Sequence, residues 1–320
     1  MTKSLVADIG GTNTRVSLAD GAQIDRSSIR RYANAEHGGL GEVLTRYLTE
    51  AGAPGIGGAC VAVAGPVDNG VAHMTNIDWY IDSAGVGQAS GAARVAVLND
   101  LQAQGHGLDA LSPGSVRPLI ARPATARSRA SRLVIGVGTG FNAAPVHHAP
   151  GGRLVAPSEC GHVTLPVRSD ADLALMRYVE KVHGFAGVED VLSGRGLERL
   201  YAFHASEAGL STRLKAAEIM AAMAEGKDPA VMATGRNFIR LVGAVAGDLA
   251  LIHVPYAGIY LIGGVARAFT AFYDPFGFEA AFCDKGRFSE FMKEFAVSIV
   301  EDDYVALTGC AMFLADGLAD

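Results

Sequence analysis

The sequence has few charged residues and few cysteines. Asp, Glu, Lys and Arg make up 19% of the 320 residues, and the Lys and Arg residues are scattered without a polybasic block. Binding to a nucleic-acid backbone needs clustered positive charge, and the net charge is −6, so we expect no nucleic-acid partner. The four cysteines have neither paired CxxC spacing nor a histidine-rich neighbourhood, which predicts reduced thiols and no zinc site.

The sequence also lacks a long uninterrupted apolar run. The most apolar stretch, residues 242–265, contains Asp248, His253 and Pro255 and does not resemble a membrane span. The first four residues enter a predicted strand at once, which leaves no room for a secretory signal. We therefore expect a cytoplasmic protein with no membrane partner.

Glycine, by contrast, is abundant. The chain has 40 glycines, many at the ends of strand-like runs, and hydrophobic residues account for 49% of it. This composition excludes a disordered protein and indicates a turn-dense α/β protein. The length allows two domains with sizeable cores.

The most informative motif is a glycine turn between two β-type runs, residues 5–9 and 15–19. Asp8 lies near the end of the first run, and Thr12 and Thr14 add hydroxyl donors to the amides of the turn Gly10-Gly11-Thr12-Asn13. Such a turn favours phosphate binding. A strand follows the glycines, whereas a Walker loop or a Rossmann fingerprint leads into a helix, so both nucleotide folds are disfavoured. The alternative is an ordinary hairpin with a Gly-Gly turn.

The same device occurs a second time. Residues 132–137 lead into Gly138-Thr139-Gly140, and residues 141–146 lead out. This repeat predicts two related halves that each contribute a phosphate-binding hairpin to a shared cleft. A third apolar run, residues 258–265, contains Gly263 and Gly264, a pair that would suit a flat base or a ribose.

Several acidic or imidazole side chains stand at unusual positions. Asn99 and Asp100 follow an apolar strand and precede a predicted helix, where α/β sheets bind their ligands. Glu159 and His162 flank Cys160-Gly161, and Glu189 precedes a Ser-Gly turn. Each has a simpler explanation: Asp100 as a helix cap, His162 as a core histidine, Glu189 as a solvated charge.

The remaining segments predict the domain organisation. Residues 113–132 are rich in Pro, Ala, Ser and Arg without periodicity and are interpreted as the crossing into a second domain. We expect a small α/β domain of residues 1–112 plus 304–320, closed by a terminal helix over 304–314, and a large α/β domain of residues 113–303. Further helices are predicted at 171–181, 198–208, 214–225 and 233–252, and a strand at 259–262.

These features together fit the transfer of a phosphoryl group from a nucleotide to a polyhydroxylated acceptor. Backbone amides, hydroxyls and Mg²⁺ offset the charge of the phosphates, while one carboxylate orients and deprotonates the attacking hydroxyl. Asn, Glu and His side chains suit the recognition of sugar hydroxyls.

The motifs resemble those of the bacterial glucokinases, in the hexokinase and actin-like superfamily, nearly from end to end. The similar stretches are residues 6–13, 99–100, 138–140, 159–162, 189 with 192–194, 263–264 and 282–288. The resemblance implies a two-lobed actin/hexokinase-like, ribonuclease H-like α/β fold, with mixed sheets flanked by helices. It implies a glucokinase that uses ATP and Mg²⁺ to phosphorylate the 6-hydroxyl of glucose, the first step of glycolysis, and a homodimer.

Carried over residue by residue, the resemblance assigns Asp100 as the general base. It assigns the other sugar hydroxyls to Asn99, Glu159, His162 and Glu189. It assigns the phosphates and adenosine to Gly10, Gly11, Thr12, Asn13, Gly138, Thr139, Gly140, Gly263 and Gly264, and Mg²⁺ to Asp8 through water.

The sequence departs from the family pattern near the predicted sugar site. Cys160 and Ser158 stand where glycines are frequent, and Phe141-Asn142 follows the second turn. These residues would tighten the pocket, alter sugar preference or raise the Michaelis constant. The alternatives are a kinase of another hexose, a non-catalytic sugar sensor, or a phosphohydrolase on the same fold. The related repressor, open-reading-frame and kinase family carries a cysteine-rich zinc motif that this chain lacks, so zinc is not predicted.

Overall fold

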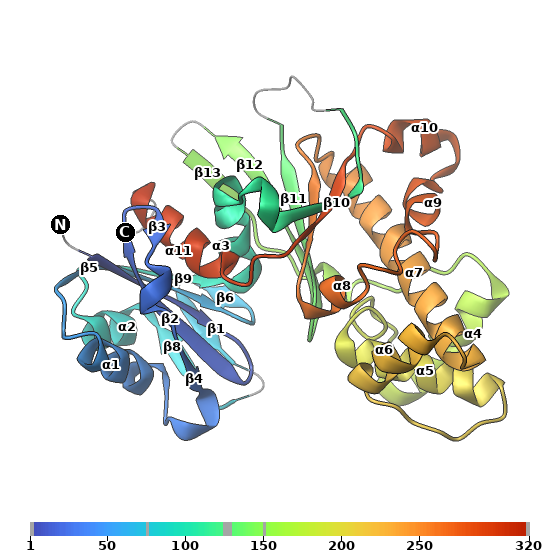
Figure 1. Ribbon diagram of the computed structural model, residues 1–320, viewed down its shortest axis with the longest axis horizontal. Helices are drawn as coiled ribbons and strands as arrows, with labels where there is room; N and C mark the ends of the chain where they lie inside the picture. Colours follow the sequence, from blue (N-terminus) through green and yellow to red (C-terminus); the bar gives the residue numbers. More distant parts are fainter. Residues whose placement is uncertain (1–2, 75–76, 124–129, 150–151, 318–320) are drawn as a thin grey trace. The chain divides into compact units, whose positions relative to one another are not determined.

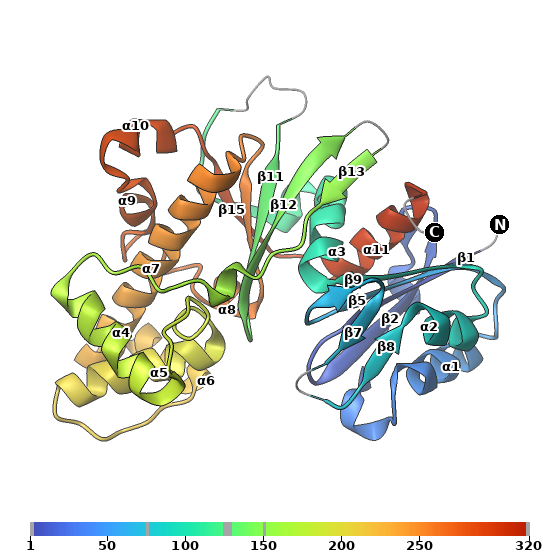
Figure 2. The ribbon, with the colours of Figure 1, turned by 180° about the vertical axis from the view of Figure 1, so that it is seen from behind.

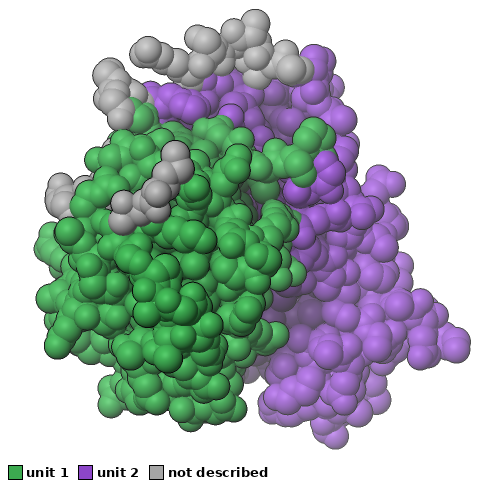
Figure 3. Space-filling model, turned by 60° about the vertical axis from the view of Figure 1, so that its left-hand side comes forward, with its two compact units in different colours: residues 1–113, 149–157, 302–320 green, residues 114–148, 158–301 purple. Residues whose placement is uncertain are grey.

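The computed structural model describes residues 3–74, 77–123, 130–149 and 152–317. Within it the chain forms two compact units, residues 1–113, 149–157 and 302–320, and residues 114–148 and 158–301 (Figure 3). The predictions for residues 1–2, 75–76 and 124–129 lie outside the described residues. Each unit is built around its own sheet and is described separately below.

Most of the elements are labelled in Figures 1 and 2. The strands are β1 (Lys3–Ile9), β2 (Asn13–Asp20), β3 (Gln23–Ile24), β4 (Arg30–Ala33), β5 (Ile56–Val63), β6 (Val67–Asp68), β7 (Val71–His73), β8 (Tyr80–Asp82), β9 (Arg94–Asn99), β10 (Val116–Ile120), β11 (Arg132–Val137), β12 (Phe141–Ala149), β13 (Gly152–Val155), β14 (Ile259–Ile262) and β15 (Val297–Val300). The helices are α1 (Leu40–Glu50), α2 (Ser83–Ser90), α3 (Asp100–Gly107), α4 (Asp170–His183), α5 (Gly194–Glu207), α6 (Ala216–Glu225), α7 (Pro229–His253), α8 (Gly264–Ala268), α9 (Phe278–Cys283), α10 (Ser289–Met292) and α11 (Val305–Ala315).

The first unit contains a mixed sheet with the strand order β3-β2-β1-β5-β9. The β1–β2 pair is antiparallel, whereas β1, β5 and β9 run parallel. Along β1 the buried side chains alternate between two clusters, because successive residues of a strand point to opposite faces. Leu5 and Ala7 pack in one cluster with α1, and Val6 packs in the other with α11. Both faces are therefore covered, as the apolar sequence of this strand requires.

The C-terminal helix α11 packs against α3 on one face of this sheet (Figure 1). Gly309 lies at the crossing, where an added Cβ would stand 1.6 Å from the carbonyl oxygen of Ala103. The glycine therefore permits a close approach of two backbones, although glycine disfavours a helix interior. The terminal helix predicted over residues 304–314 is present as α11.

The second unit repeats the strand plan of the first. The strands of this unit pair in the order β10-β15-β14-β11-β12, with an antiparallel β11–β12 hairpin and parallel β11, β14 and β15. The path β12-β11-β14-β15 thus matches β2-β1-β5-β9, including the direction of each strand. The predicted repeat of a glycine-turn hairpin is confirmed at the level of sheet topology.

The helices of the second unit form one hydrophobic core with its sheet. The long helix α7 begins with Pro229 after the cap Asp228, whose carboxylate accepts hydrogen bonds from two backbone N–H groups. The predicted helices at 171–181, 198–208, 214–225 and 233–252 are present, each with ends shifted by a few residues. The strand predicted at 259–262 is present with those bounds.

Two sequence-based expectations differ from the structure. The segment interpreted as a crossing contains strand β10, which is antiparallel to β15, about 180 residues later in the chain. Residues 149–157 belong to the first unit, although the predicted boundaries assigned them to the large domain. The reason is local packing: Gln102 on α3 donates a hydrogen bond to the carbonyl of Val155, and Arg153 donates one to the carbonyl of His106.

Candidate active site

The first glycine turn joins β1 to β2 and is held from behind by a buried asparagine. The N–H of Gly10 donates to the carbonyl of Asn13 at 3.0 Å. Asn34, which is 2% exposed, donates from Nδ2 to the carbonyl of Gly10 at 2.7 Å and accepts the hydroxyl of Thr14 at 2.8 Å. Its backbone N–H also bonds the carbonyl of Thr12. The turn is therefore held in place by the side chain of Asn34, which no sequence motif indicates.

Asp8 lies near the end of β1 and is paired with Arg15, the residue directly opposite it on β2. Arg15 Nη1 lies 3.1 Å from Asp8 Oδ2, and the Asp8 side chain is only 18% exposed. Burial raises the pKa of Asp8, and the Arg15 guanidinium opposes this rise. The antiparallel register of the hairpin predicts this pair, so Arg15 was recognisable from the sequence.

Asn99 and Asp100 lie where β9 ends and α3 begins. Asn99 is the N-cap: its Oδ1 accepts the N–H of Leu101 at 3.0 Å, and its Nδ2 donates to the carbonyl of Gly65 at 2.9 Å. Gln102 completes a capping box by accepting the N–H of Asn99. Asp100 is the first helical residue, and its Oδ1 also accepts the N–H of Leu101. The helix cap considered for Asp100 is thus provided mainly by its neighbour.

Asp8 and Asp100 lie at the same edge of the first sheet, because β1, β5 and β9 are parallel neighbours in register. Burial raises the pKa of Asp100 to about 7, and the carboxylate of Asp8 adds to this rise. A carboxylate with a pKa near neutrality is suited to accept a proton under physiological conditions.

The second glycine turn joins β11 to β12 and is enclosed by two other segments. The N–H of Gly138 donates to the carbonyl of Gly140 at 2.9 Å, and the N–H of Gly194, at the start of α5, donates to the carbonyl of Gly138 at 2.8 Å. Gly263, with φ +113°, lies so close to β11 that an added Cβ would stand 2.5 Å from the carbonyl oxygen of Val137. The predicted phosphate and adenosine glycines of this unit are therefore neighbours.

The structure also brings Glu159, His162 and Glu189 together beside this turn. Glu189 accepts the N–H of Phe141 on Oε2 at 2.9 Å and donates its own N–H to the carbonyl of Gly161 at 2.8 Å. Glu159 Oε2 lies 4.0 Å from His162 Nε2. Burial raises the pKa of Glu159, His162 lowers it, and Glu189 adds to the rise.

The simple explanations considered for His162 and Glu189 do not hold. Both Glu159 and His162 are mostly exposed, so His162 is not a core histidine. Glu189 is bonded to the backbone beside the second turn and is not a solvated charge.

The predicted site residues are divided between the units. The first unit holds Asp8, Gly10, Gly11, Thr12, Asn13, Asn99 and Asp100, and the second holds Gly138, Thr139, Gly140, Glu159, His162, Glu189, Gly263 and Gly264. Among the described residues, no group of three or more His, Cys, Asp or Glu side chains forms a metal site. Of the residues described, no helix is both long and apolar enough to cross a membrane.

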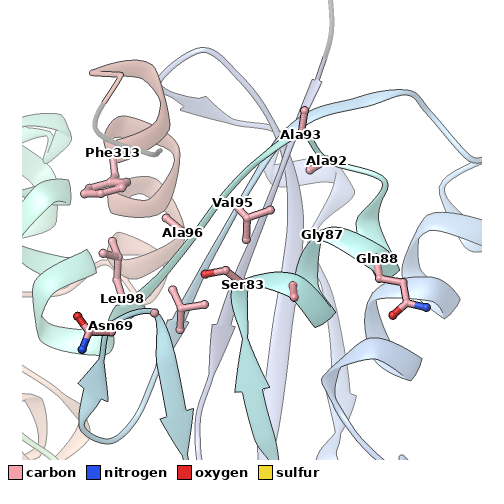
Figure 4. A pocket seen from close by; sticks show the side chains of 13 residues that line it. Asn69, Ser83, Gly87, Gln88, Ala92, Ala93, Val95, Ala96, Leu98 and Phe313 are labelled. Carbon is pink, nitrogen blue, oxygen red and sulfur yellow. The ribbon is translucent and has the colours of Figure 1, made fainter.

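A separate pocket of about 580 Å³ opens along β9 in the first unit. Val95 on β9, Ser83 and Gln88 on α2, and Phe313 on α11 line it (Figure 4). None of the residues predicted to bind phosphate or sugar contributes to its walls. The pocket therefore does not belong to the candidate active site.

Two α/β units that each contain a glycine-turn hairpin in the same strand plan, with Asp8 and Asp100 at strand ends of the first unit, indicate a sugar kinase of the hexokinase and actin-like fold. The chain belongs to the glucokinase family, whose family model matches residues 5–317. It is 30% identical over 318 residues to the glucokinase of Caulobacter sp. strain K31, which covers 98% of this chain and 96% of that protein. It is 31% identical over 315 residues to the glucokinase of Caulobacter vibrioides strain NA1000, which covers 97% and 94%.

Solved structures agree with this assignment. The glucokinase from an Antarctic psychrotroph matches with a TM-score of 0.84 and 30% identity, covering 98% of this chain and 99% of that one. The glucokinase from Balamuthia mandrillaris in complex with glucose matches with a TM-score of 0.81 at 21% identity, covering 98% and 93%, and supports the fold. The expected family and fold class are confirmed.

Proposed function

We propose that this protein transfers the γ-phosphoryl group of ATP to the 6-hydroxyl of glucose, giving glucose 6-phosphate and ADP, the first step of glycolysis. The observation that carries the proposal is Asp100, a carboxylate with a pKa near 7 at the end of a parallel strand in the sheet that holds the first glycine turn. Membership of the glucokinase family supports both the reaction and the acceptor.

In the proposed reaction, Asp100 takes the proton of the 6-hydroxyl as that oxygen attacks the γ-phosphorus. The new oxygen–phosphorus bond forms, the bond to the leaving oxygen of ADP breaks, and the proton remains on Asp100 until product release. The transition state is loose, so the catalytic contribution of the protein is mainly positioning and charge stabilisation.

The two glycine turns hold the phosphates from their separate units. Gly10, Gly11, Thr12 and Asn13 form one cradle, and Gly138, Thr139 and Gly140 form the other. Both cradles offer backbone N–H groups and a threonine hydroxyl to an anion. Gly263 and Gly264 contact the adenosine, because neither carries a side chain that would keep a flat ring away from the backbone.

Asp8 fits a magnesium ion bound through water. Its Oδ2 is held by Arg15, and Mg²⁺ sites commonly use one or two carboxylates together with substrate phosphates and water. Bound Mg²⁺ would neutralise charge on the ATP phosphates. Asp8 itself holds negative charge at this edge of the sheet and influences the pKa of Asp100.

Glucose binds through Asn99, Glu159, His162 and Glu189 in addition to Asp100. These side chains have directional hydrogen-bonding groups, so an epimer with a displaced hydroxyl would leave some of them unpaired. Asn99 and Glu189 are already bonded to the backbone, which fixes their orientation before the sugar arrives. Such preorganisation favours selectivity.

The cellular setting that we propose is a homodimer in the cytoplasm, without a nucleic-acid or membrane partner. All four cysteines are unbridged, which agrees with a reducing compartment. Light scattering of the purified protein measures the oligomeric state.

The test is a coupled assay of ADP release with ATP, Mg²⁺ and glucose, mannose, fructose or N-acetylglucosamine. We expect glucose to give the highest kcat/KM. Asp100→Ala should lower kcat by roughly 10³-fold and leave glucose binding measurable by calorimetry, because a general base acts on the chemical step. Asp20→Ala, at an exposed position in the same unit, is the matched control and should retain full activity.

Three results would contradict the proposal. Turnover of another hexose alone would assign a different acceptor. Phosphate release without any sugar would indicate a phosphohydrolase. Glucose binding without turnover would indicate a sugar sensor.

A further inference from the structure

The side chain of Asn142 lies at the centre of a polar cluster in the second unit. Asn142 is the second residue of β12, directly after the second glycine turn, and its neighbours Ser158 and Cys160 flank Glu159. These three residues are also the polar positions at which the chain departs from the family pattern. The structure shows that the departures contact one another.

The amide of Asn142 bonds the backbone on both sides of Glu159. Its Nδ2 donates to the carbonyl oxygen of Ser158, and its Oδ1 accepts the N–H of Cys160 at 3.1 Å. Oδ1 also accepts the N–H of Ala143 at 2.8 Å. These hydrogen bonds fix the orientation of the Asn142 amide. If the amide were flipped, Nδ2 would face the N–H groups of Ala143 and Cys160, and Oδ1 would face the carbonyl oxygen of Ser158.

Side chains complete the cluster. Asn142 Nδ2 lies 3.4 Å from Glu159 Oε2, and Oδ1 lies 3.4 Å from Ser158 Oγ and 3.5 Å from Cys160 Sγ. The N–H of Cys160 also donates a hydrogen bond to Ser158 Oγ, at 3.1 Å. The segment around Glu159 is thus held by several hydrogen bonds that converge on one amide.

This arrangement matters because the other hydrogen bond that holds Glu159 involves only its backbone: its carbonyl oxygen accepts the N–H of His162 at 3.0 Å. Its side chain is 53% exposed, and His162 is 4.0 Å away. Its backbone, with φ −125° and ψ 43°, lies outside the regular helical and strand regions. An exposed glutamate on an irregular segment varies both in backbone position and in side-chain rotamer, and hydrogen bonds to its flanking peptides and to its carboxylate reduce both. Asn142 supplies that restraint from a neighbouring strand.

We propose that Asn142 is a positioning residue that fixes Glu159 for hydrogen bonding to the sugar and thereby sets sugar affinity and epimer selectivity. The inference rests on the proposed sugar kinase function and deepens it. Asn142 acts through Glu159, so its removal affects the sugar more than the nucleotide. The chemical step at Asp100 is not altered.

The first test is Asn142→Ala, which removes the amide. We expect KM for glucose to rise about tenfold or more, while kcat and KM for ATP stay within about twofold. The ratio of kcat/KM for glucose to that for mannose should fall, because a mobile Glu159 accepts hydrogen bonds less selectively. A partial loss of folded protein would lower the apparent kcat and leave both KM values unchanged, so this split separates positioning from a structural role.

The second test, Asn142→Asp, keeps the size of the side chain and the acceptor for Cys160. It replaces the donor to Ser158 by an oxygen and places a carboxylate beside Glu159. We expect KM for glucose to rise at least as much as in Asn142→Ala. The matched control is Asn237→Ala, which removes an amide bonded to Arg240 and His204 in the same unit and should leave KM for glucose unchanged.

The outcomes distinguish this inference from the proposed function. If the unmodified protein shows no sugar-dependent ADP release, the proposed function fails. If it does phosphorylate glucose, and Asn142→Asp is folded with an unchanged KM for glucose and an unchanged glucose-to-mannose ratio, the positioning role of Asn142 is wrong. Equal losses in the glucose and ATP constants of both variants would also overturn it.

Discussion

The two glycine turns share a strand plan but are constrained in different ways. The first lies beside charged groups: Asp8 pairs with Arg15, and Asp100 lies at the same edge of the sheet. An added Cβ at Gly10 would meet its nearest neighbour, a backbone oxygen, at 3.5 Å, an ordinary contact. The first turn therefore has steric freedom and a concentrated negative charge.

The second turn differs from the first in its steric surroundings. An added Cβ would stand 2.6 Å from a carboxylate oxygen of Glu189 at Gly140, and 2.5 Å from the carbonyl oxygen of Val137 at Gly263. The turn is held by Glu189 and by the start of α5. The first turn therefore lies beside two buried carboxylates, whereas the second is enclosed by close contacts with neighbouring segments.

Gly263→Ala should have the largest effect, because it tests the tight packing of the second turn. The alanine would adopt φ +113° and clash with the backbone of Val137, at a cost of roughly 3–5 kcal/mol in unfolding free energy. Urea denaturation measures this loss. The control is Gly138→Ala, whose Cβ would have no neighbour within 4 Å and should cost less than about 1 kcal/mol. Equal losses of unfolding free energy in Gly263→Ala and Gly138→Ala would contradict the steric difference between the two turns.

Asp100→Asn tests the concentrated charge of the first unit through stability. The pKa of Asp100 is raised to about 7, so the folded protein retains a proton that the unfolded chain releases above its ordinary pKa of 3.8. Ionised Asp100 therefore costs stability, and this cost grows as the pH rises from about 4 to 7. Three pKa units at about 1.4 kcal/mol each predict a variant that is more stable by roughly 4 kcal/mol at pH 8 and little changed near pH 4.

Thermal unfolding at several pH values measures this gain. Asp20→Asn, at an exposed position of the same unit, should give no comparable pH-dependent gain. A gain for Asp100→Asn that did not vary with pH would mean that burial of the charge is not its cause.

Asn34→Ala tests whether the first turn depends on a support behind it. The variant leaves the buried hydroxyl of Thr14 and the carbonyl of Gly10 without this partner, which should cost roughly 1–2 kcal/mol. Asn13→Ala removes an exposed hydrogen bond to Thr12 and should cost less than about 0.5 kcal/mol. Chemical denaturation of both variants compares them, and an equal loss would show that the turn holds its shape without Asn34.

The parts of the fold that the sequence predicted are those with local signals. The glycine turns and the strand before Asp100 follow from residues close together in the chain. Strand β10 was missed because its partner, β15, lies far away in the sequence and its own composition is typical of a loop. The close approach at Gly309 depends on a helix about 200 residues earlier, so the glycine alone did not indicate it.

The same distinction applies to the candidate site. Asp8, Asp100 and the glycines stand in recognisable motifs, whereas Asn34 has no motif and acts through a pairing between β2 and β4. Arg15 follows from hairpin register. Ser158 and Cys160 were visible only as departures from a pattern, and their shared contact with Asn142 required the three-dimensional structure. The roles of these residues in binding and catalysis stay predictions.

Asp8→Asn should have the smallest energetic effect and tests the coupling within the first unit. Burial is the main cause of the raised pKa of Asp100, and the charge of Asp8 is the second. We therefore expect kcat/KM for glucose in the unmodified protein to decrease as the pH is lowered below about 7. In the variant this acid limb should move to lower pH by one unit or less, which corresponds to at most about 1.4 kcal/mol.

The pH profile remains measurable even if the variant has a lower maximal rate, because the position of the limb is independent of its height. An unmoved limb would show that the two carboxylates titrate independently, whereas a limb near pH 4 would show that the charge of Asp8, and not burial, is the dominant cause.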